Sequence, residues 1–322
     1  MSTGAPAITQ GSGELAGPDG PADNEPRRNK LAFWLVAPAT VILVLVLGYP
    51  IVRMVMLSLQ QAKLRNIVKG TEQWNDFANY TKILSDPYFW TVVGRTVVFT
   101  AVCVVATMAL GTLVALLLNR LGTKMRLTVL VGLLLAWATP AVTATQVWQF
   151  LFDTQFGVAN WALVQLGFDQ FEGYSWLAEP LSLLTLAAII VVWAAIPFVA
   201  LTLFAGLTQV PNEVYEAAAL DGANAWTAFW RITVPQLAPI FLILTALSTI
   251  WDFRVFTQVF ILQKSGGIAK DTDLLGIYAY RVSFSANDFG VGSAIGVTMV
   301  LMLLVLSVFY IRAMIKQLDE AA

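Results

Sequence analysis

The sequence predicts an all-α polytopic membrane protein with six transmembrane helices and a helical cytoplasmic loop between the fourth and fifth of them. Its 322 residues are 58% hydrophobic and only 12% charged, whereas a soluble domain carries about 25% charged residues. Six apolar runs also exceed the roughly 20 residues that an α-helix needs to cross the hydrocarbon core of a bilayer. These runs occupy residues 32–59, 90–119, 127–152, 181–207, 236–262 and 291–316.

The N-terminal segment, residues 1–29, is rich in Gly, Pro, Ala and Ser and contains almost no large apolar side chains. Such a segment cannot bury enough surface to offset its chain entropy, so we expect it to be disordered. A signal peptide is an alternative, but the apolar run that follows is too long for one and lacks a small-residue cleavage site. Residues 30–322 are therefore expected to form one six-span membrane domain, whose first span is retained and is interrupted by two prolines.

The distribution of lysine and arginine predicts how the chain lies in a bacterial cell membrane, because cytoplasmic loops carry an excess of these residues. The short loop at 119–126 contains three of them, whereas the loop at 153–180 contains none. Both termini are therefore expected to be cytoplasmic, and so is the loop at 211–235.

The composition excludes several classes of chemistry. The sequence contains no histidine and a single cysteine, Cys103, which rules out histidine-based nucleophilic catalysis, histidine metal sites and disulfides within the chain. It contains no G-x-x-x-x-G-K-[ST] sequence, the phosphate-binding loop of many ATPases. Its net charge of −1 gives no electrostatic basis for binding nucleic acid. These exclusions favour a membrane protein that is not an enzyme and that binds no cofactor, metal or nucleic acid.

Two outer segments, at 72–90 and 156–176, are rich in aromatic residues. Tryptophan and tyrosine gather at membrane interfaces, so one interpretation is an aromatic belt. The other is a docking surface for a soluble partner outside the cell. A third outer segment, at 264–290, contains two adjacent glycines and several aromatic residues and could reach toward a ligand path.

The loop at 211–235 has the pattern of two short amphipathic helices. Glu213 and Glu216 lie in the first turn after Asn212, a residue suited to capping, and carboxylates there favour the helix dipole. An Asp-Gly pair that ends at Gly222 then indicates a turn. A helix that lies on the membrane surface usually carries several cations for anionic lipid, but this loop has only Arg231. Packing within the protein's own core and docking into a groove of a cytoplasmic partner remain, and the acidic, small-residue face favours docking.

The same loop resembles a known signature. Its spacing of E-A-A, three residues, Gly, nine residues and I-x-x-P is similar to the EAA signature of permease subunits of binding-protein-dependent ABC importers. The matching residues are Glu216, Ala217, Ala218, Gly222, Ile232 and Pro235, with Val234 where the signature usually has leucine. Over residues 30–316 the layout resembles the carbohydrate importers of the maltose-permease-like branch, including the disaccharide and amino-sugar importers of actinobacteria.

The resemblance implies that the loop couples transport to ATP hydrolysis on another subunit. The implied contacts with that subunit are Glu213, Glu216, Ala217, Ala218, Asp221, Gly222, Ile232 and Pro235, with Glu216 as the main docking residue. The implied partners are a second permease subunit with its own EAA loop, a cytoplasmic ABC ATPase dimer that binds the ATP, and an extracytoplasmic sugar-binding lipoprotein. Closure of the ATPase dimer would pull on the loop, switch the spans between inward- and outward-facing states, and so import a di- or oligosaccharide.

A candidate sugar site lies in the fifth span, where Ser248, Asp252 and Val255 share one helical face. A carboxylate at that depth is costly and marks a functional site by default. The alternative is a structural ion pair of Asp252 with Arg254 or Arg95. The resemblance implies that this stripe is the sugar-contacting face, and the further implied or candidate contacts are Ala195, Phe198, Val199, Thr143 and Gln146. For Thr143 and Gln146, hydrogen bonding between helices is an equally good explanation.

Other functions fit the pattern less well or equally well. A permease for another small polar solute, such as a glycerol phosphodiester or a polyol, would show the same features. A secondary transporter that acts alone would be expected to bury several carboxylates or histidines, but this chain has few deep acids and no histidine. A membrane glycosyltransferase would need a metal-binding acidic pair on an inner loop, and a pure scaffold would leave Asp252 unexplained.

Overall fold

The computed structural model describes the secondary structure of residues 25–321 and the side chains of residues 33–316. The chain divides into two compact units, Met1–Val52 and Arg53–Ala322. The disorder expected at 1–29 stays a prediction for residues 1–24, which lie outside the described part of the chain, and is wrong for residues 25–29, which form the start of a helix.

Helix α1 (Glu25–Ser58) begins in the first unit and contains Pro38 and Pro50 within its length. The predicted interruption of the first span by these prolines is therefore wrong. Each proline removes one backbone hydrogen bond, but an apolar segment in a bilayer satisfies its remaining backbone groups only by staying helical.

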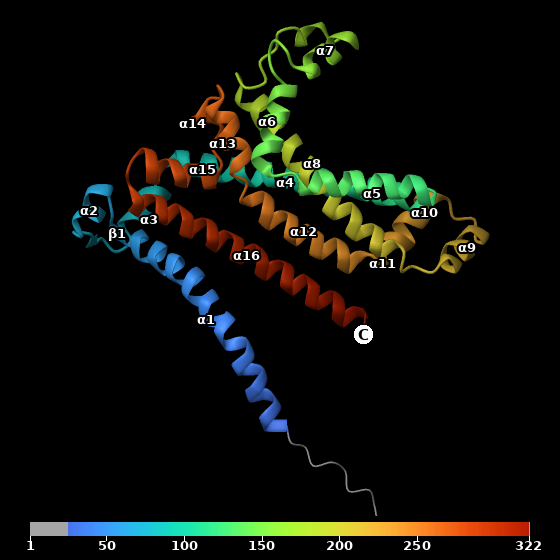
Figure 1. The fold of residues 1–322 in the computed structure, drawn as a ribbon, viewed down its shortest axis with the longest axis horizontal. Helices are drawn as coiled ribbons and strands as arrows, with labels where there is room; N and C mark the ends of the chain where they lie inside the picture. Colours follow the sequence, from blue (N-terminus) through green and yellow to red (C-terminus); the bar gives the residue numbers. More distant parts are fainter. Residues whose placement is uncertain (1–24, 322) are drawn as a thin grey trace, which may run out of the picture. The chain divides into compact units, whose positions relative to one another are not determined.

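The second unit contains the other long helices, which Figure 1 shows in chain order from cyan to red. They are α4 (Pro87–Arg120), α5 (Thr123–Ala138), α8 (Pro180–Leu207), α12 (Ala238–Phe253), which is followed by the shorter α13 (Thr257–Lys264), and α16 (Phe289–Ala321). Among the described residues, five helices are long and apolar enough to span a membrane, and six if one bent pair counts as a single span. The predicted all-α membrane fold is thus confirmed.

The bent pair replaces the third predicted span, which the sequence suggested was continuous. The chain bends by 103° between α5 (Thr123–Ala138) and α6 (Ala141–Leu151). The cause is Pro140, which has no backbone N–H and disfavours the helical conformation of the residue before it. Thr139 is accordingly extended, with ψ at 124°.

The fifth predicted span corresponds to Ala238–Lys264, which counts as one of the five candidate spans, but its helix is interrupted once. Helix α12 ends at Phe253, and α13 begins at Thr257 after three residues that contain neither proline nor glycine. The last turn of α12 tightens, because the amides of Arg254 and Val255 bond to carbonyls only three residues earlier. This break lies within the predicted sugar-contacting stripe.

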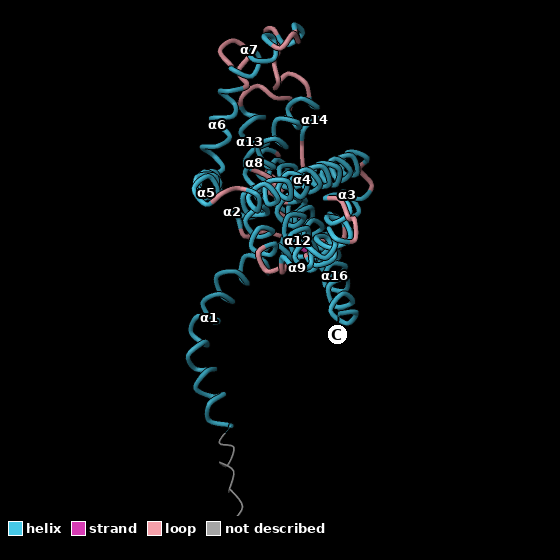
Figure 2. Tube along the Cα trace, turned by 90° about the vertical axis from the view of Figure 1, so that its right-hand side faces the viewer, coloured by secondary structure: helices cyan, strands magenta, loops and turns pink. Residues whose placement is uncertain are grey.

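The remaining elements are short, and Figure 2 shows the loops between helices as brief pink stretches. Strands β1 (Gln60–Gln61) and β2 (Gln73–Trp74) pair antiparallel. The short helices are α2 (Leu64–Lys69), α3 (Ala78–Leu84), α7 (Val158–Gln165), η1 (Asp169–Phe171), α14 (Ala269–Thr272), α15 (Leu275–Tyr280) and η3 (Arg281–Ser285). The segment at 153–179 packs its aromatic rings on one another, as where Phe171 stacks on Trp176 at 5.4 Å, and both interpretations of these aromatic residues stay predictions.

The core of the second unit forms where α4 packs along α8. Gly111 on α4 permits this close approach, because a Cβ atom there would lie 2.6 Å from Cγ1 of Val199 on α8. Small residues at such contacts are typical of membrane helices, whose association depends on tight packing rather than on the hydrophobic effect.

A buried polar group, which we call the Asp273 cluster, ties the segment between α13 and α16 to the start of α4. Asp273 is fully buried and forms an ion pair with Arg281. Its carboxylate also accepts hydrogen bonds from Tyr88, at 2.8 Å, and from Gln263, at 3.3 Å. Burial raises the pKa of Asp273, while these hydrogen bonds and the charge of Arg281 act in the opposite direction. The cluster thus holds a carboxyl group in an environment that opposes its charge.

Candidate functional site: the loop between α8 and α12

The loop folds as two short helices joined at Gly222, as the sequence predicted. Helix α9 (Asn212–Leu220) ends in a Schellman motif, in which the amide of Ala223 bonds to the carbonyl of Ala218 and that of Gly222 to Ala219. Gly222 has a φ of +82°, a left-handed conformation that side chains disfavour. A Cβ atom there would meet no neighbour within 4 Å. The left-handed backbone, and not a lack of space, therefore explains the glycine at this position.

The helix caps differ from the prediction. Pro211, not Asn212, precedes the first turn of α9, and no side chain caps that helix. The next helix, α10 (Ala225–Ala228), does have a side-chain cap: the side chain of Asn224 accepts a hydrogen bond of 2.8 Å from the amide of Thr227.

After α10 the chain forms a π-helix, η2 (Phe229–Thr233), and then the short α11 (Val234–Gln236). Single π-helical turns are rare and occur frequently at functional sites. Of the predicted loop residues, Ile232 lies in η2 and is half-buried, while Pro235 lies in α11 and is exposed. Tyr215 on α9 and Thr233 on η2 connect the two halves of the loop, with their hydroxyl oxygens 3.1 Å apart.

The surface of α9 carries the predicted docking residues. Glu213, Glu216 and Leu220 are exposed and share one helical face by their spacing, and Leu220 is 89% exposed. Ala217 and Asp221 are exposed beside them, whereas Ala218 is half-buried. Across the described residues, neither glutamate forms a salt bridge. Unpaired carboxylates beside an exposed leucine are suited to contact with another protein.

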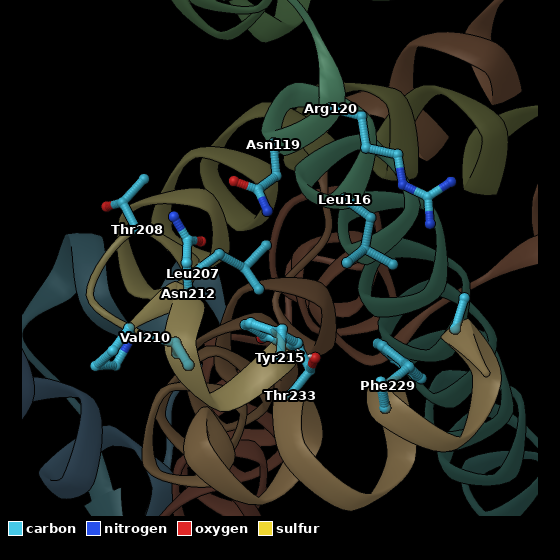
Figure 3. Close-up of a pocket in the computed structure, with 13 residues that line it drawn as sticks. Leu116, Asn119, Arg120, Leu207, Thr208, Val210, Asn212, Tyr215, Phe229 and Thr233 are labelled. Atoms are coloured by element: carbon cyan, nitrogen blue, oxygen red, sulfur yellow. Dashed lines mark hydrogen bonds between the residues drawn. The ribbon is translucent and has the colours of Figure 1, made fainter. Parts of the chain in front are cut away.

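A cavity of about 640 Å³ lies behind the loop, and we call it the loop cavity. Figure 3 shows its lining, which comes from the ends of α4 and α8, from α9 and from the segment after Gly222. The polar lining includes Asn119, Arg120, Thr208, Asn212, Tyr215 and Thr233, and the apolar lining includes Leu116, Leu207, Val210, Pro211 and Phe229. Sequence reasoning missed this cavity, because its residues lie far apart in the chain.

The predicted sugar-contacting stripe is buried rather than open. Ser248, Asp252 and Val255 are only 3%, 4% and 8% exposed, and α12 packs against α4. Neither alternative ion pair of Asp252 is observed among the described residues. Arg95 donates to backbone carbonyls in the segment after α13, and no salt bridge joins Asp252 to Arg254. Within the part of the chain that is described, Oδ2 of Asp252 has no hydrogen-bond partner.

The other predicted wall residues are only partly brought together. Val199 is fully buried against α4, while Ala195 and Phe198 are half-buried on α8. Thr143 and Gln146 are exposed on α6.

One further aromatic residue was not predicted. Trp251 is 44% exposed, and its ring lies 5.2 Å from that of Phe198. The signal available in the sequence was its position three residues after Ser248 and directly before Asp252, at the edge of the same stripe.

Comparisons with known proteins identify the family of the chain. Residues 107–318 match the family described as binding-protein-dependent transport system inner membrane component. A diacetylchitobiose uptake system permease protein of Streptomyces coelicolor is 41% identical over 288 residues, which cover 89% of this chain and 88% of the relative. A trehalose/maltose transport system permease protein of Thermococcus litoralis is 31% identical over 288 residues, which cover 89% and 94%.

Among solved structures, a bacterial ABC transporter involved in the import of the acidic polysaccharide alginate has the same fold. The TM-score is 0.75 at 20% sequence identity, over 90% of this chain and 96% of that one. The family match covers most of the described spans and the whole loop, and the sequence relatives are named as permease proteins. The chain therefore belongs to the family of binding-protein-dependent transport system inner membrane components, as a permease subunit and not an enzyme.

Proposed function

We infer that the chain is the permease subunit of an ATP-driven importer that moves a di- or oligosaccharide into the cytoplasm. The observation that carries this proposal is the exposed, unpaired face of α9, which leaves Glu213, Glu216 and Leu220 free to contact a partner. The names of relatives that take up diacetylchitobiose and trehalose or maltose support a carbohydrate substrate.

The proposed partners are an ATPase dimer that binds α9, a second permease subunit and an extracytoplasmic binding protein. In this arrangement the loop and both termini face the cytoplasm. Movement of α9 would pass through the Tyr215–Thr233 contact to η2 and then, along the chain, through α11 to α12. The loop would thereby transmit ATPase closure to the span that holds Asp252, and the spans would alternate in access.

The proposed sugar site combines the aromatic pair with the buried stripe. Sugar sites use apolar and aromatic surface together with a few placed polar groups, and Trp251 beside Phe198 offers exposed ring surface. The unpartnered Oδ2 of Asp252 lies one residue away in the chain. Since buried polar groups are normally satisfied, we propose that Asp252 and Ser248 bond to the sugar when α12 moves relative to α4.

Reconstitution tests the proposed function. The chain would be purified with its ATPase, its second permease subunit and its binding protein, inserted into liposomes, and assayed for uptake of radiolabelled disaccharides. We expect uptake that requires both ATP and the binding protein. Uptake by this chain alone, without an ATPase, would contradict the proposal.

If Asp252 bonds to the sugar, its substitution should lower uptake without lowering the thermal stability of the complex. An Asp252→Asn substitution is expected to lower uptake at least tenfold, because a hydrogen bond to a charged group contributes about 1.5–3 kcal/mol. The midpoint of thermal unfolding is not expected to fall, since a buried amide is less costly than a buried carboxylate. Both quantities would be measured on the same purified complex.

Thr100→Val is the matched control, because the hydroxyl of Thr100 is also buried without a partner. It should leave both uptake and thermal stability unchanged or slightly raise the latter. If Asp252→Asn instead unfolds the protein, Asp252 is a structural residue and the proposed sugar contact is wrong.

A further inference from the structure

Arg254 is an exposed arginine within a membrane span. It lies well inside both ends of the candidate span Ala238–Lys264. Among the described residues, its side chain forms no hydrogen bond or ion pair. A charged side chain at such a position is costly in lipid and almost always faces the interior of a helix bundle or a water-filled cavity. The surface that carries Arg254 is therefore not suited to face lipid.

The tightened last turn of α12 decides which side chain accompanies this arginine. The amide of Arg254 bonds to the carbonyl of Trp251, at 3.2 Å, instead of to the carbonyl four residues earlier. In a turn closed by such a bond, side chains three residues apart eclipse each other. Arg254 thus lies over Trp251, and both are exposed. Val255 lies over Asp252 in the same way, and both are buried.

A simpler explanation is that Arg254 extends toward the headgroups, as long cationic side chains do near helix ends. However, α13 lies between Arg254 and the outer end of the span, and its 8 residues rise about 12 Å at about 1.5 Å per residue. That explanation also does not account for Trp251, which exposes its ring on the same face and packs 5.2 Å from the ring of Phe198 on another helix.

The two exposed side chains offer different contacts to a sugar. The ring of Trp251 presents an apolar face, which suits the apolar face of a sugar ring. A guanidinium group has five donors and no acceptor, and its planar fork fits the oxygens of a carboxylate. An ionised Asp252 only accepts, so it is suited to the hydroxyl hydrogens of the sugar. Arg254 is therefore suited to substituents whose oxygens only accept.

We propose that Arg254 is a specificity-determining residue of the sugar path, which binds a carbonyl or carboxylate oxygen of the substrate while a sugar ring stacks on Trp251. The substrate is then a di- or oligosaccharide that carries N-acetyl groups or carboxylates. This inference rests on the proposed transport function and adds to it one contact and the class of substituent that the contact selects.

The selectivity is tested by uptake of related disaccharides into liposomes that contain the complete complex. N,N′-diacetylchitobiose and cellobiouronic acid have the linkage of cellobiose but carry acetyl carbonyls or a carboxylate. Arg254→Gln should raise KM at least about tenfold for whichever of these two sugars the unaltered complex imports, because a hydrogen bond from a charged group is lost. KM for cellobiose should change little. A selective loss for the first sugar identifies an N-acetyl substituent, and one for the second a carboxylate.

Two variants control for the charge. Arg254→Lys keeps the positive charge but not the planar fork, so it should recover only part of the loss. Lys264→Gln removes the cation at the outer end of the same span, and it should leave every KM unchanged.

Thiol labelling tests the position of Arg254 without depending on uptake. A membrane-impermeant methanethiosulfonate reagent attacks thiolates, which form in water and not in lipid. In the reconstituted complex, Arg254→Cys should be labelled, whereas Leu301→Cys, at an exposed apolar position of α16, should not. The unaltered chain sets the background, because its single cysteine, Cys103, is buried.

The proposal is overturned by equal changes of KM for all three sugars, by import of cellobiose alone, or by labelling of Arg254→Cys no faster than that of Leu301→Cys. Absence of ATP-driven uptake of any disaccharide is a different result, because it contradicts the proposed transport function itself.

Discussion

Replacing Arg281 by glutamine is expected to lower the free energy of unfolding by up to about 3 kcal/mol, at the lower end of the range for a fully buried ion pair, since the side chain of Arg281 is 29% exposed. The reason is that Asp273, which is fully buried, would lose its only salt-bridge partner among the described residues. The hydrogen bonds from Tyr88 and Gln263 would remain, but they do not neutralise the charge. Chemical denaturation of the purified chain in detergent would measure the effect.

A surface ion pair provides the comparison. Lys82 and Asp288 lie 3.4 Å apart, and the side chain of Lys82 is 66% exposed. Such exposed pairs contribute only about 0–1 kcal/mol, so Lys82→Gln should change the free energy of unfolding little. Equal effects of the two substitutions would show that the Asp273 cluster does not behave as a buried ion pair.

The effect of Arg281→Gln should also depend on pH in a defined direction. Burial already raises the pKa of Asp273, and Arg281 opposes that rise, so the pKa of Asp273 should rise further in the variant. The folded variant then binds more protons than the unfolded chain at pH values above the ordinary carboxyl pKa of about 4, and its stability falls as the pH rises. The difference from the unaltered chain should therefore shrink toward acidic pH, and a difference that is constant with pH would contradict this account.

Apolar length was enough to predict where the spans lie, because a membrane helix must satisfy its backbone groups internally. It was not enough to predict their continuity. The break at Thr139 has a cause in the sequence, since it precedes Pro140, but Pro38 and Pro50 lie inside α1 without ending it. The break after Phe253 contains no proline or glycine, so it depends on tertiary packing that single-sequence patterns do not report.

The two parts of the candidate site were predictable to different degrees. Gly222 could be predicted because a left-handed cap is a local requirement of the backbone. Ser248 and Asp252 lie one turn apart on α12, whereas Val255 lies in the break after that helix. The burial of this stripe depends on a neighbour distant in sequence. The loop cavity depends on four separate segments and left no local pattern.

Replacing Glu216 by alanine is expected to lower uptake by the reconstituted complex at least tenfold. Glu216 is exposed on α9 and has no salt-bridge partner in the described chain, so the substitution should not disturb the fold. In the proposed complex, its carboxylate pairs with the ATPase, and truncating one member of a buried, hydrogen-bonded charge pair costs about 2–5 kcal/mol. ATP hydrolysis should then continue but should no longer respond to the loaded binding protein.

Two further variants serve as controls, one for the loss of any exposed carboxylate and one for the charge of Glu216. Glu179→Ala removes an exposed carboxylate just before α8, at the end of that helix opposite the loop, and it should leave uptake unchanged. Glu216→Gln keeps the length and helix-forming tendency of the side chain but not its charge, so a loss equal to that of Glu216→Ala would assign the coupling to the carboxylate. If Glu216→Ala transports at the unaltered rate, α9 is not docked through this residue.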